Sequence, residues 1–540
     1  MRENLPAQPS PSRPEETRPT DESPSPDDPA AVPAAAEAPA RNGRGWTLAA
    51  VSIATFMLML DLTVVNVALP DVRASFHSSF PALQWVLDAY ALGLAVFLLT
   101  AGSLADRIGR KRVFVIGFVI FILASLACGI APGVAVLSVA RGVQGIGGAV
   151  LFAVGPALIG QEYHGKDRGK AFGVFGGVVG LAIAFGPLLG GALTALDWRY
   201  IFLVNVPVGI VALVVTQLRM RESRESNPRP VDRVGVVTFC AALGLLVLGF
   251  LRGEAEGWDS APILGMFSGS VVLLVVFFVM ERRLGERAML DMTLFGNVTF
   301  NGLSAATVLC SAATMSAIFL EISYVQNVLG LSPWAAGVRF LPLTLTLFVA
   351  AAVAGGLTAK VPPRVLVGVS MLSISVGLWL VTLVGPNDRW TALLPSMIVT
   401  GLGMGLFNPP RASLSIAVVE PDKAGMASGM GETFQQVGTA VGIAALGAFF
   451  QARASHLFDV SAAGRGLGDG AGDLVAAGGG AQLAAHVQGH ETAARVALAA
   501  RTAFTDGLSD VMTVCSGIAL AGAIAAFCFI RRRDLHDSAL

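Results

Sequence analysis

Charged residues are scarce in this 540-residue chain. Asp, Glu, Lys and Arg together make up 14% of it, whereas 54% of the residues are hydrophobic and the mean hydropathy is +0.68. A soluble protein has about 25% charged residues. The shortage of charge therefore excludes an ordinary soluble protein and predicts an all-α integral membrane protein. The formal net charge is zero, which gives no indication of nucleic-acid binding.

Residue types that support metal or redox chemistry are few and poorly placed. The five cysteines fall in apolar segments without a C-x-x-C pair, which disfavours a disulfide framework or a zinc site. None of the six histidines lies in the middle of a predicted span, and no G-x-x-x-x-G-K-[ST] loop for ATP is present. We therefore expect no metal and no cofactor, and we do not expect an enzyme.

The N-terminal segment lacks the apolar residues that a folded domain requires. Residues 1–45 contain ten of the 28 prolines together with many Ser, Glu and Asp residues. Such a segment cannot bury enough apolar surface to become ordered, and the first apolar stretch begins too late for a signal peptide. We predict a disordered cytoplasmic tail over 1–45.

Apolar segments of about the length that a bilayer requires, roughly 20 residues, follow the tail. They predict 14 transmembrane helices. Their approximate ranges are 46–69, 83–104, 113–131, 134–160, 171–194, 200–218, 234–251, 261–280, 298–324, 335–357, 364–384, 391–410, 425–450 and 510–531.

Lys and Arg gather in alternate loops. The loop 107–112 has four of them, the loop 166–170 has three, the linker 219–233 has five arginines, and Arg531–Arg533 close the chain. The short loops of the other set carry at most one each. Because short cytoplasmic loops carry the excess of positive charge, both termini are predicted to be cytoplasmic.

Asp61 is a carboxylate in the middle of the first apolar segment. An acid at that depth costs roughly 2.5–3.5 kcal/mol on insertion scales, so it normally faces a polar cavity or takes up a proton. Arg141, in the fourth segment, likewise requires a carboxylate, carbonyl groups or water. The alternatives are an acid held neutral by polar neighbours, without a role, and a structural ion pair of Arg141 that only fixes packing.

The loop 102–112 reads GSLADRIGRKR. Gly102 and Gly109 permit a close-packed turn between two helices, and Asp106 can cap a helix or pair with an arginine. The basic residues are also explained by attraction to anionic headgroups and by topology alone.

The pattern G-x-L-A-D-R-x-G-R-K-R between the second and third spans resembles the signature loop of the major facilitator superfamily. Further motifs resemble its fourteen-span drug/proton antiporter family. They are LDLTVVNVALP (60–70), RGVQGIGGA (141–149), GVVGLAIAFGPLLGG (177–191) and WRYIFLVNVP (198–207).

This resemblance implies two six-helix bundles that rock around a central cavity, plus two extra helices in lipid-facing positions. It assigns proton coupling to Asp61 and Arg141. It implies a conformational latch of Gly102, Asp106, Arg107, Gly109, Arg110 and Arg112. It implies an antiporter motif of Gly186, Pro187, Gly190 and Gly191.

The domain organisation follows from the spans and from this resemblance. After the tail (1–45) we predict an N-terminal bundle (46–218), a cytoplasmic linker (219–233), two extra helices (234–280), a linker (281–297), a C-terminal bundle (298–531) with a long external loop (451–509), and a cytoplasmic C-terminus (532–540). Part of the external loop, 481–504, has helical composition.

The second half contains candidate partners of the first. LEISYVQNVL (320–329) can be aligned with LDLTVVNVAL (60–69), so Glu321 is a counterpart of Asp61, with chance similarity as the alternative. Glu432 lies in a span, in either a structural or a substrate role, and Glu321 and Glu432 are candidate partners of Arg339. The candidate residues of the substrate cavity are Asn66, Gln144, Glu321, Gln326 and Glu432.

The function that these features indicate is proton-coupled export of amphipathic small molecules, drugs or antibiotics, often cationic, across a bacterial plasma membrane. The expected partners are the small-molecule substrate, protons and membrane lipid, with no nucleic acid and no obligate protein partner. One alternative is a dedicated exporter of a single endogenous metabolite or antibiotic. An alternative from another class is a sensor or scaffold that does not transport, against which the charged residues inside spans argue.

Overall fold

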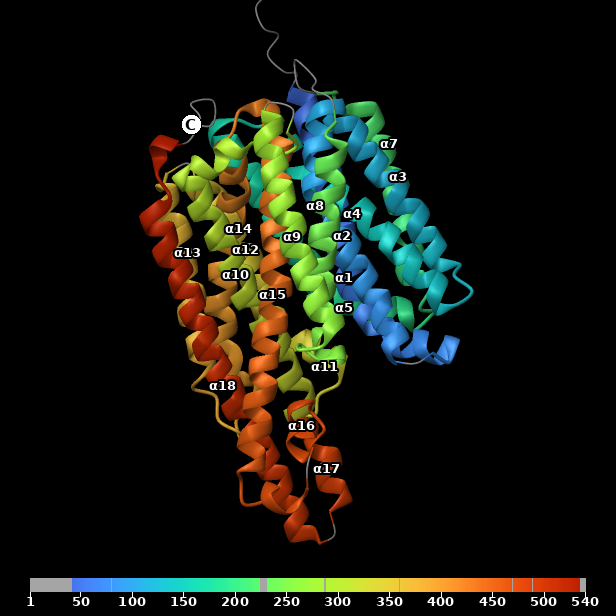
Figure 1. The fold of residues 1–540 in the computed structure, drawn as a ribbon, viewed down its shortest axis with the longest axis vertical. Helices are drawn as coiled ribbons and strands as arrows, with labels where there is room; N and C mark the ends of the chain where they lie inside the picture. The colour runs from blue at the N-terminus through green and yellow to red at the C-terminus, as the bar shows by residue number, and fades with distance from the viewer. Residues whose placement is uncertain are drawn as a thin grey trace, which may run out of the picture. The chain divides into compact units, whose positions relative to one another are not determined.

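A computed structural model describes residues 41–534 except 79, 224–230, 286–287, 359, 469 and 488. The predicted tail therefore lies almost entirely outside the described residues. Arg41–Leu540 form one compact unit. Throughout the described residues the regular structure is helical, without a strand, as Figure 1 shows.

The first half of the chain forms long helices joined by short connections. Long apolar runs account for the length of these helices, because a helix satisfies its own backbone groups in lipid. The helices are α1 (Arg41–Phe76), α2 (Phe80–Ile108), α3 (Arg110–Gly129), α4 (Val134–Glu162), α5 (Gly165–Thr194), α6 (Tyr200–Leu203), α7 (Asn205–Arg219), α8 (Arg233–Glu256) and α9 (Ala261–Leu284).

The second half continues in the same way. A short 3₁₀ turn, η2 (Met292–Gly296), precedes α10 (Val298–Ser323), which ends in a π-helical turn, η3 (Tyr324–Val328). The remaining helices are α11 (Pro333–Arg339), α12 (Leu341–Leu357), α13 (Pro363–Val381), α14 (Leu394–Ala417), α15 (Ala424–Asp459), α16 (Ala471–Ala476), α17 (Gly480–His486) and α18 (His490–Phe529).

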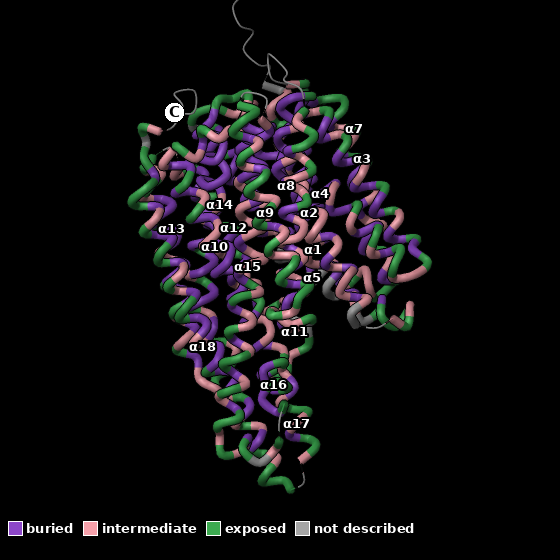
Figure 2. The backbone as a smooth tube through the Cα atoms, in the orientation of Figure 1, coloured by how far each residue is buried: buried purple, intermediate pink, exposed green. Residues whose placement is uncertain are grey.

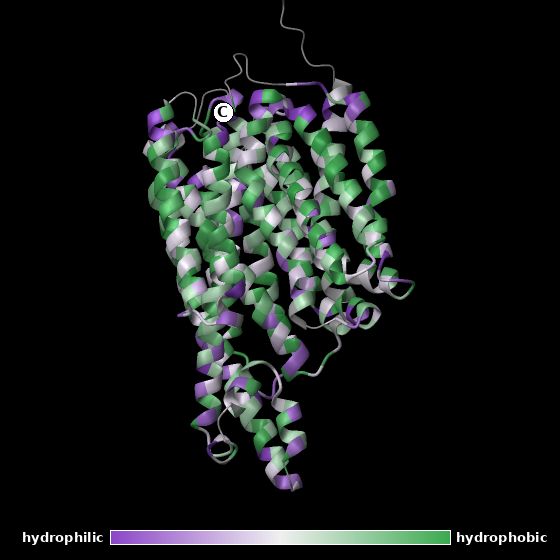
Figure 3. Ribbon diagram, turned by 45° about the vertical axis from the view of Figure 1, so that its right-hand side comes forward, coloured by the Kyte–Doolittle hydropathy of each residue, from purple (hydrophilic) through white to green (hydrophobic). Residues whose placement is uncertain are grey.

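Twelve helices in the described part of the chain are long and apolar enough to cross a membrane. The 30-residue α5 and the 17-residue α12 occupy the predicted fifth and tenth spans. Together they are consistent with the fourteen predicted spans. Figure 3 shows hydrophobic residues along the helices and many hydrophilic residues at their ends.

Each half of the chain has its own hydrophobic core. One cluster of buried side chains is built mainly from α1–α7 and another from α10–α18, and Figure 2 shows the buried residues along the helices. The halves meet where α2 packs on α15 and α5 packs on α12. A Cβ at Gly102 would overlap the carbonyl oxygen of Gly425, and one at Gly169 would overlap that of Gly355. Glycine is therefore required for the closest approach of the halves.

These close approaches lie at one end of the helices. We call it the basic end, defined by the described residues of the connections 107–112, 163–170, 219–233, 285–297 and 418–425. Gly102 lies near the end of α2 and Gly425 at the start of α15. The two halves are thus in direct contact at the basic end.

The two extra helices, α8 and α9, cover part of this contact. α8 packs on both α2 and α15, and α9 packs on α8. Val271, Val272 and Val275 of α9 are more than half exposed, as a lipid-facing helix requires. The predicted lipid-facing position therefore suits α9, whereas the face of α8 that covers α2 and α15 is buried protein.

The segment predicted as a long external loop is largely helical. α15 continues to Asp459, and α18 begins at His490 rather than near 510. The short helices α16 and α17 lie between them, and Phe458, Val475 and Val496 belong to a separate apolar cluster there. The last two long helices therefore extend beyond the apolar segments that define the predicted spans, because their extensions bury side chains against one another.

Candidate functional site

Asp61 and Arg141 lie together inside the N-terminal half. Asp61 is in α1 and Arg141 in α4, and their side chains form an ion pair between Oδ2 and Nη1. The exposed fractions of the two residues are 2% and 1%. Two charges taken out of water at this depth require each other, because removing one partner of a buried pair is strongly destabilising.

Two amide side chains complete the hydrogen bonding of Asp61. Oδ1 accepts from Nε2 of Gln144 at 2.9 Å and from Nδ2 of Asn205 at 3.2 Å. Gln144 also donates to Oγ of Ser125 at 2.9 Å and accepts from Arg141 at 2.7 Å. The prediction that Gln144 lines a substrate cavity is wrong for this conformation, because its amide is used up inside the bundle.

The guanidinium of Arg141 is held on further sides. Nε donates to the carbonyl oxygen of Val86 at 3.2 Å, and the group lies 4.0 Å from the ring centroid of Tyr90. A cation over an aromatic face is stabilised by the ring quadrupole. The expected opening of Asp61 onto a central cavity is therefore not present in this conformation. We call Asp61, Arg141, Gln144, Asn205 and Tyr90 the α1–α4 network.

Asp106 connects the two halves at the basic end. It accepts from Nε and Nη2 of Arg110 at 2.9 and 2.8 Å, one turn further along the chain. Its oxygens also accept from the backbone nitrogens of Gly425 and Met426 at 2.9 and 2.8 Å. These are free amides at the start of α15, where a carboxylate is favoured by the helix dipole. Arg110 in turn donates to the carbonyl oxygen of Pro421 at 2.6 Å.

The other predicted latch residues serve the turn or different partners. Gly109 has φ +116°, a backbone conformation that residues with a side chain rarely adopt, which explains the glycine at this position. Arg107 donates to the carbonyl oxygen of Ala288. Arg112 lies 3.6 Å from the carboxylate of Glu222 in the connection after α7. Asp106, Arg107 and Arg110 thus reach across the basic end, whereas Arg112 stays within its own half.

The predicted antiporter motif forms the contact between α5 and α1. A Cβ at Gly186 would overlap Oγ1 of Thr63, and one at Gly190 would lie 3.3 Å from Cα of Val64. A Cβ at Gly191 would lie 3.3 Å from the ring of Trp334, in the other half. The side chains of Pro187 and of Asn66, a predicted cavity residue, are outside the described part of the structure.

The remaining acidic candidates lie in the C-terminal half and are separate from one another. Glu321, near the end of α10, is buried, and its Oε2 has no hydrogen-bond partner among the described residues. Gln326 lies in η3 and is half-buried. Glu432 of α15 is paired with Arg411 of α14, with Nη2 and Oε1 2.9 Å apart.

Two arginines also belong to this half: Arg339, for which the sequence predicts partners, and Arg411, for which it predicts none. Arg339 pairs with neither Glu321 nor Glu432, contrary to the prediction. Its Nη1 donates to the carbonyl oxygen of Ala335 at 2.9 Å, and the group lies 5.6 Å from the ring centroid of Trp390. Arg411 was not predicted as a site residue, because the predicted span ended at 410.

Within the described residues no group of three or more His, Cys, Asp or Glu side chains could hold a metal ion. The polar groups of the site form ion pairs and hydrogen bonds between helices.

Comparisons with known proteins agree with this architecture. The sequence model described as "Major Facilitator Superfamily" matches residues 51–443. The multidrug resistance protein Stp of Mycobacterium tuberculosis is 35% identical over 413 residues, which cover 75% of this chain and 76% of that protein. The tetracenomycin C resistance and export protein of Streptomyces glaucescens is 32% identical over 420 residues, 77% of this chain and 78% of that protein.

The fold is also shared with solved transporters. The structure of the proton:xylose symporter XylE aligns with a TM-score of 0.61 at 13% identity, covering 90% of this chain and 96% of that one. At this identity the likeness concerns the fold alone. Taken with the sequence matches and the membrane-spanning helices, it leads to one conclusion: this chain belongs to the major facilitator superfamily and is a multi-pass membrane transporter.

Proposed function

We propose that this transporter exports amphipathic small molecules, drugs or antibiotics, across a bacterial plasma membrane in exchange for protons. The similarity to a multidrug resistance protein and to an antibiotic export protein supports the class of substrate. The concentration of Lys and Arg in the connections at the basic end supports a cytoplasmic position of that end and of both termini.

The α1–α4 network is the observation that carries the proposed coupling. When Asp61 is ionised, its charge is matched by Arg141 and its oxygens accept from three side chains. A proton on Asp61 cancels the ion pair and leaves Arg141 as an unmatched buried cation. Breaking such a pair costs about 3–5 kcal/mol, which is enough to favour a different packing of α1 against α4. Protonation of Asp61 thereby drives the change of conformation.

The basic end is the gate of this proposed cycle. In the conformation seen here Asp106 and Arg110 hold the start of α15, and the contact of α2 with α15 closes the basic end. Opening requires these bonds to break, after which substrate enters from the cytoplasm. Closing the gate again and opening the opposite end releases the substrate outside, while Asp61 takes up an external proton.

The acids of the C-terminal half are proposed substrate contacts. Glu321 and Glu432 are both buried, and each has one oxygen without a hydrogen-bond partner among the described residues. A substrate cation that enters the opened space would supply that missing partner. This arrangement favours positively charged or strongly hydrogen-bonding molecules.

A second candidate is a dedicated exporter of one endogenous antibiotic. The similarity to the tetracenomycin C resistance and export protein supports it. A panel of structurally unrelated dyes and antibiotics distinguishes the two, because a dedicated exporter transports a single chemical class.

The central experiment is dye efflux from proteoliposomes with an imposed pH gradient. Asp61→Asn should remove gradient-driven efflux, and Asp61→Glu should restore part of it. Asp88→Asn is the matched control. Asp88 is likewise a buried carboxylate, but it lies in α2 and outside the α1–α4 network. This variant should retain most of the efflux. Unchanged efflux in Asp61→Asn, or equal loss in Asp88→Asn, would reject the coupling role.

A further inference from the structure

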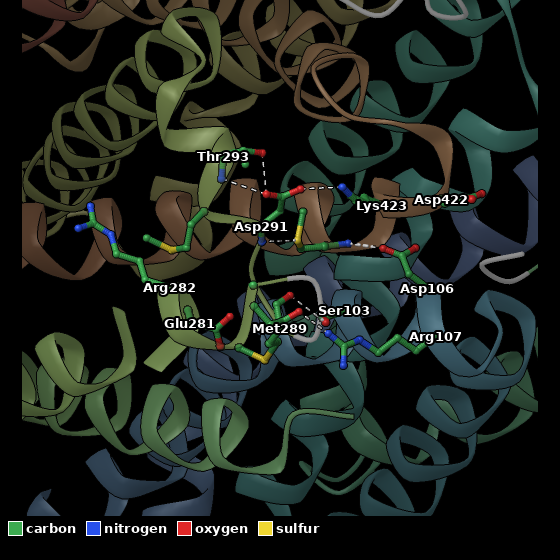
Figure 4. A pocket seen from close by; sticks show the side chains of 14 residues that line it. Ser103, Asp106, Arg107, Glu281, Arg282, Met289, Asp291, Thr293, Asp422 and Lys423 are labelled. Carbon is green, nitrogen blue, oxygen red and sulfur yellow. Dashed lines mark hydrogen bonds and ion pairs between the residues drawn. The ribbon is translucent and has the colours of Figure 1, made fainter. Parts of the chain in front are cut away.

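The connection from α9 to α10 lies against both halves of the transporter at the basic end. We call its residues Ala288–Thr293 the clasp segment. It borders a cavity of about 510 Å³ whose walls come from α2, α9 and the start of α15 as well as from the segment itself. Figure 4 shows this region, with Asp291 between Thr293 and Lys423.

The clasp segment is bonded to α2 of the N-terminal half. Arg107 donates from Nη2 to the carbonyl oxygen of Ala288, and Ser103 donates from Oγ to that of Met289 at 3.1 Å. Both α2 side chains are buried. The segment is therefore fixed to the same turns of α2 that carry Gly102 and Asp106.

The same segment is bonded to the start of α15 in the C-terminal half. Oδ2 of Asp291 lies 2.6 Å from Nζ of Lys423. The backbone nitrogen of Asp291 lies 3.3 Å from Sδ of Met426. Asp106 caps the amides of Gly425 and Met426, and Lys423 lies two residues before Gly425, so these contacts act on the same end of the same helix.

The extra helices hold the clasp segment in place. Glu281 of α9 accepts from the backbone nitrogen of Leu290 at 2.9 Å. Met289 and Leu290 are buried in an apolar cluster that also contains Phe239 of α8 and Met430 of α15. The extra pair thus has an anchored connection, which a purely lipid-facing insertion would not require.

We propose that the clasp segment is a positioning element that keeps the basic end of the transporter closed, with the Asp291–Lys423 ion pair as its releasable bond. The proposal rests on the proposed cycle, in which α2 and α15 separate at the basic end. The clasp segment can follow only one of the two helices when they separate. One set of its bonds must then break.

The bond to Lys423 is the one that gives way. Arg107 and Ser103 are buried, whereas the side chains of Lys423 and Asp291 are 26% and 22% exposed. Water can therefore replace the ion pair at low cost. Nζ of Lys423 also lies 3.5 Å from Glu420, which remains beside it on the C-terminal half after release. The clasp segment then stays with α2, and the charge of Lys423 keeps a partner.

The test measures how often the basic end opens. Ser428 of α15 is 1% exposed and is next to Gly429, which packs on the backbone of α2, so Ser428→Cys places a buried thiol beside the closed contact. Labelling of that thiol by a water-soluble maleimide, read by peptide mass spectrometry, distinguishes it from the native cysteines. Lys423→Met should raise the labelling rate about five-fold, the effect of losing a partly exposed ion pair. Lys423→Arg keeps the pair and should keep the original rate.

Two further variants define the result. Ser103→Ala removes the bond to Met289 on the α2 side of the segment, which the segment keeps after release, so it should raise labelling less than Lys423→Met does. Lys170→Met is the matched control, because Lys170 forms a 3.4 Å ion pair at the basic end that lies wholly within α5. It should leave labelling unchanged. Unchanged labelling in Lys423→Met, or an equal rise in Lys170→Met or Lys423→Arg, would overturn the proposal.

The readout is independent of proton coupling. Labelling requires neither a pH gradient nor a substrate, so failure of dye efflux in the proteoliposome experiment does not affect it. Conversely, if efflux depends on Asp61 but the labelling rate does not change in Lys423→Met, only the proposed role of the clasp segment is rejected. A matching thermal unfolding midpoint for each variant shows that the labelled protein is folded.

Discussion

The two halves of this transporter differ in how many hydrogen bonds their buried ion pairs form. In the N-terminal half, both oxygens of Asp61 accept hydrogen bonds, and Arg141 donates to Asp61, to Gln144 and to the carbonyl oxygen of Val86. The hydroxyl of the neighbouring Tyr90 has no hydrogen-bond partner among the described residues. In the C-terminal half, Arg411 and Glu432 share one hydrogen bond, while Nε and Nη1 of Arg411 and Oε2 of Glu432 have no partner among the described residues.

This difference indicates a division of labour. An ion pair whose carboxylate also accepts hydrogen bonds from two amides is stable in one arrangement and must be disrupted by a change of charge, which suits a proton switch. A pair with unused donors and acceptors can gain hydrogen bonds from a ligand, because unsatisfied buried polar groups are costly. The comparison therefore assigns coupling to the first half and substrate contact to the second.

The largest expected effect comes from breaking the ion pair between Asp61 and Arg141. Arg141→Gln leaves the Asp61 carboxylate buried without its counter-charge and should destabilise the protein by about 3–5 kcal/mol. The double variant Asp61→Asn/Arg141→Gln removes both charges and should recover part of this loss. Thermal unfolding in detergent measures both. A double variant as unstable as the sum of the two single variants would show that the pair does not act as a unit.

The corresponding change in the C-terminal half should have a smaller effect. Glu432→Gln also leaves a buried cation, Arg411, without its counter-charge, but the Gln oxygen can keep the one hydrogen bond that Glu432 accepts, so the expected destabilisation is at the lower end, about 3 kcal/mol. The same unfolding measurement provides the comparison. If Glu432→Gln were more destabilising than Arg141→Gln, the proposed division between the halves would be wrong.

A change at Glu321 tests the comparison through substrate selectivity rather than through protein stability. Gln has the same shape as Glu, and Glu321 forms no ion pair within the described residues, so Glu321→Gln should change stability by less than about 1 kcal/mol. Export of cationic dyes should weaken more than that of neutral ones. The measurement is the efflux KM and kcat for a matched pair of dyes, and equal loss for both would indicate a structural role.

The smallest expected effect concerns pH at the clasp segment. Burial by itself raises the pKa of Asp291, but hydrogen bonds from Lys423 and Thr293 outweigh it and lower the pKa below its ordinary value. The contribution of such a carboxylate is lost only as the pH falls through the lowered pKa. The ratio of labelling rates between Lys423→Met and the unmodified reporter should thus stay constant between about pH 5.5 and 8.

A ratio that changes within this range would show that another group controls the clasp. Arg107, Glu281 and Asp422 also border the cavity. They are present in both proteins, so their own titration cancels unless it depends on Lys423.

Charged residues inside apolar segments were the most informative feature of the sequence. Asp61 and Arg141 stood out because charges are rare at that depth, and the structure brings them together. Asn205 lies in a quoted motif but is an uncharged residue, so nothing in the sequence separated it from its neighbours. Arg411 was overlooked because Pro409 and Pro410 are typical of a helix end, whereas α14 continues through them to Ala417.

The sequence also does not reveal which residues the loops contact. The acidic and basic residues of 281–297 read as an ordinary cytoplasmic linker, yet Asp291 is bonded to Lys423, 132 positions away. The sequence also placed Gln144 on a cavity, because a lone amide in a span gives no indication of which neighbour it faces.

The sequence by itself determined that the chain is helical, crosses the membrane many times and belongs to its transporter family. Hydropathy and motifs are local properties, so a window of residues suffices to detect them. Only the tertiary structure decided that Asp61 pairs with Arg141, Glu432 with Arg411 and Asp291 with Lys423. Such pairs depend on the rotation and depth of each helix, which are set by packing between residues far apart in the chain.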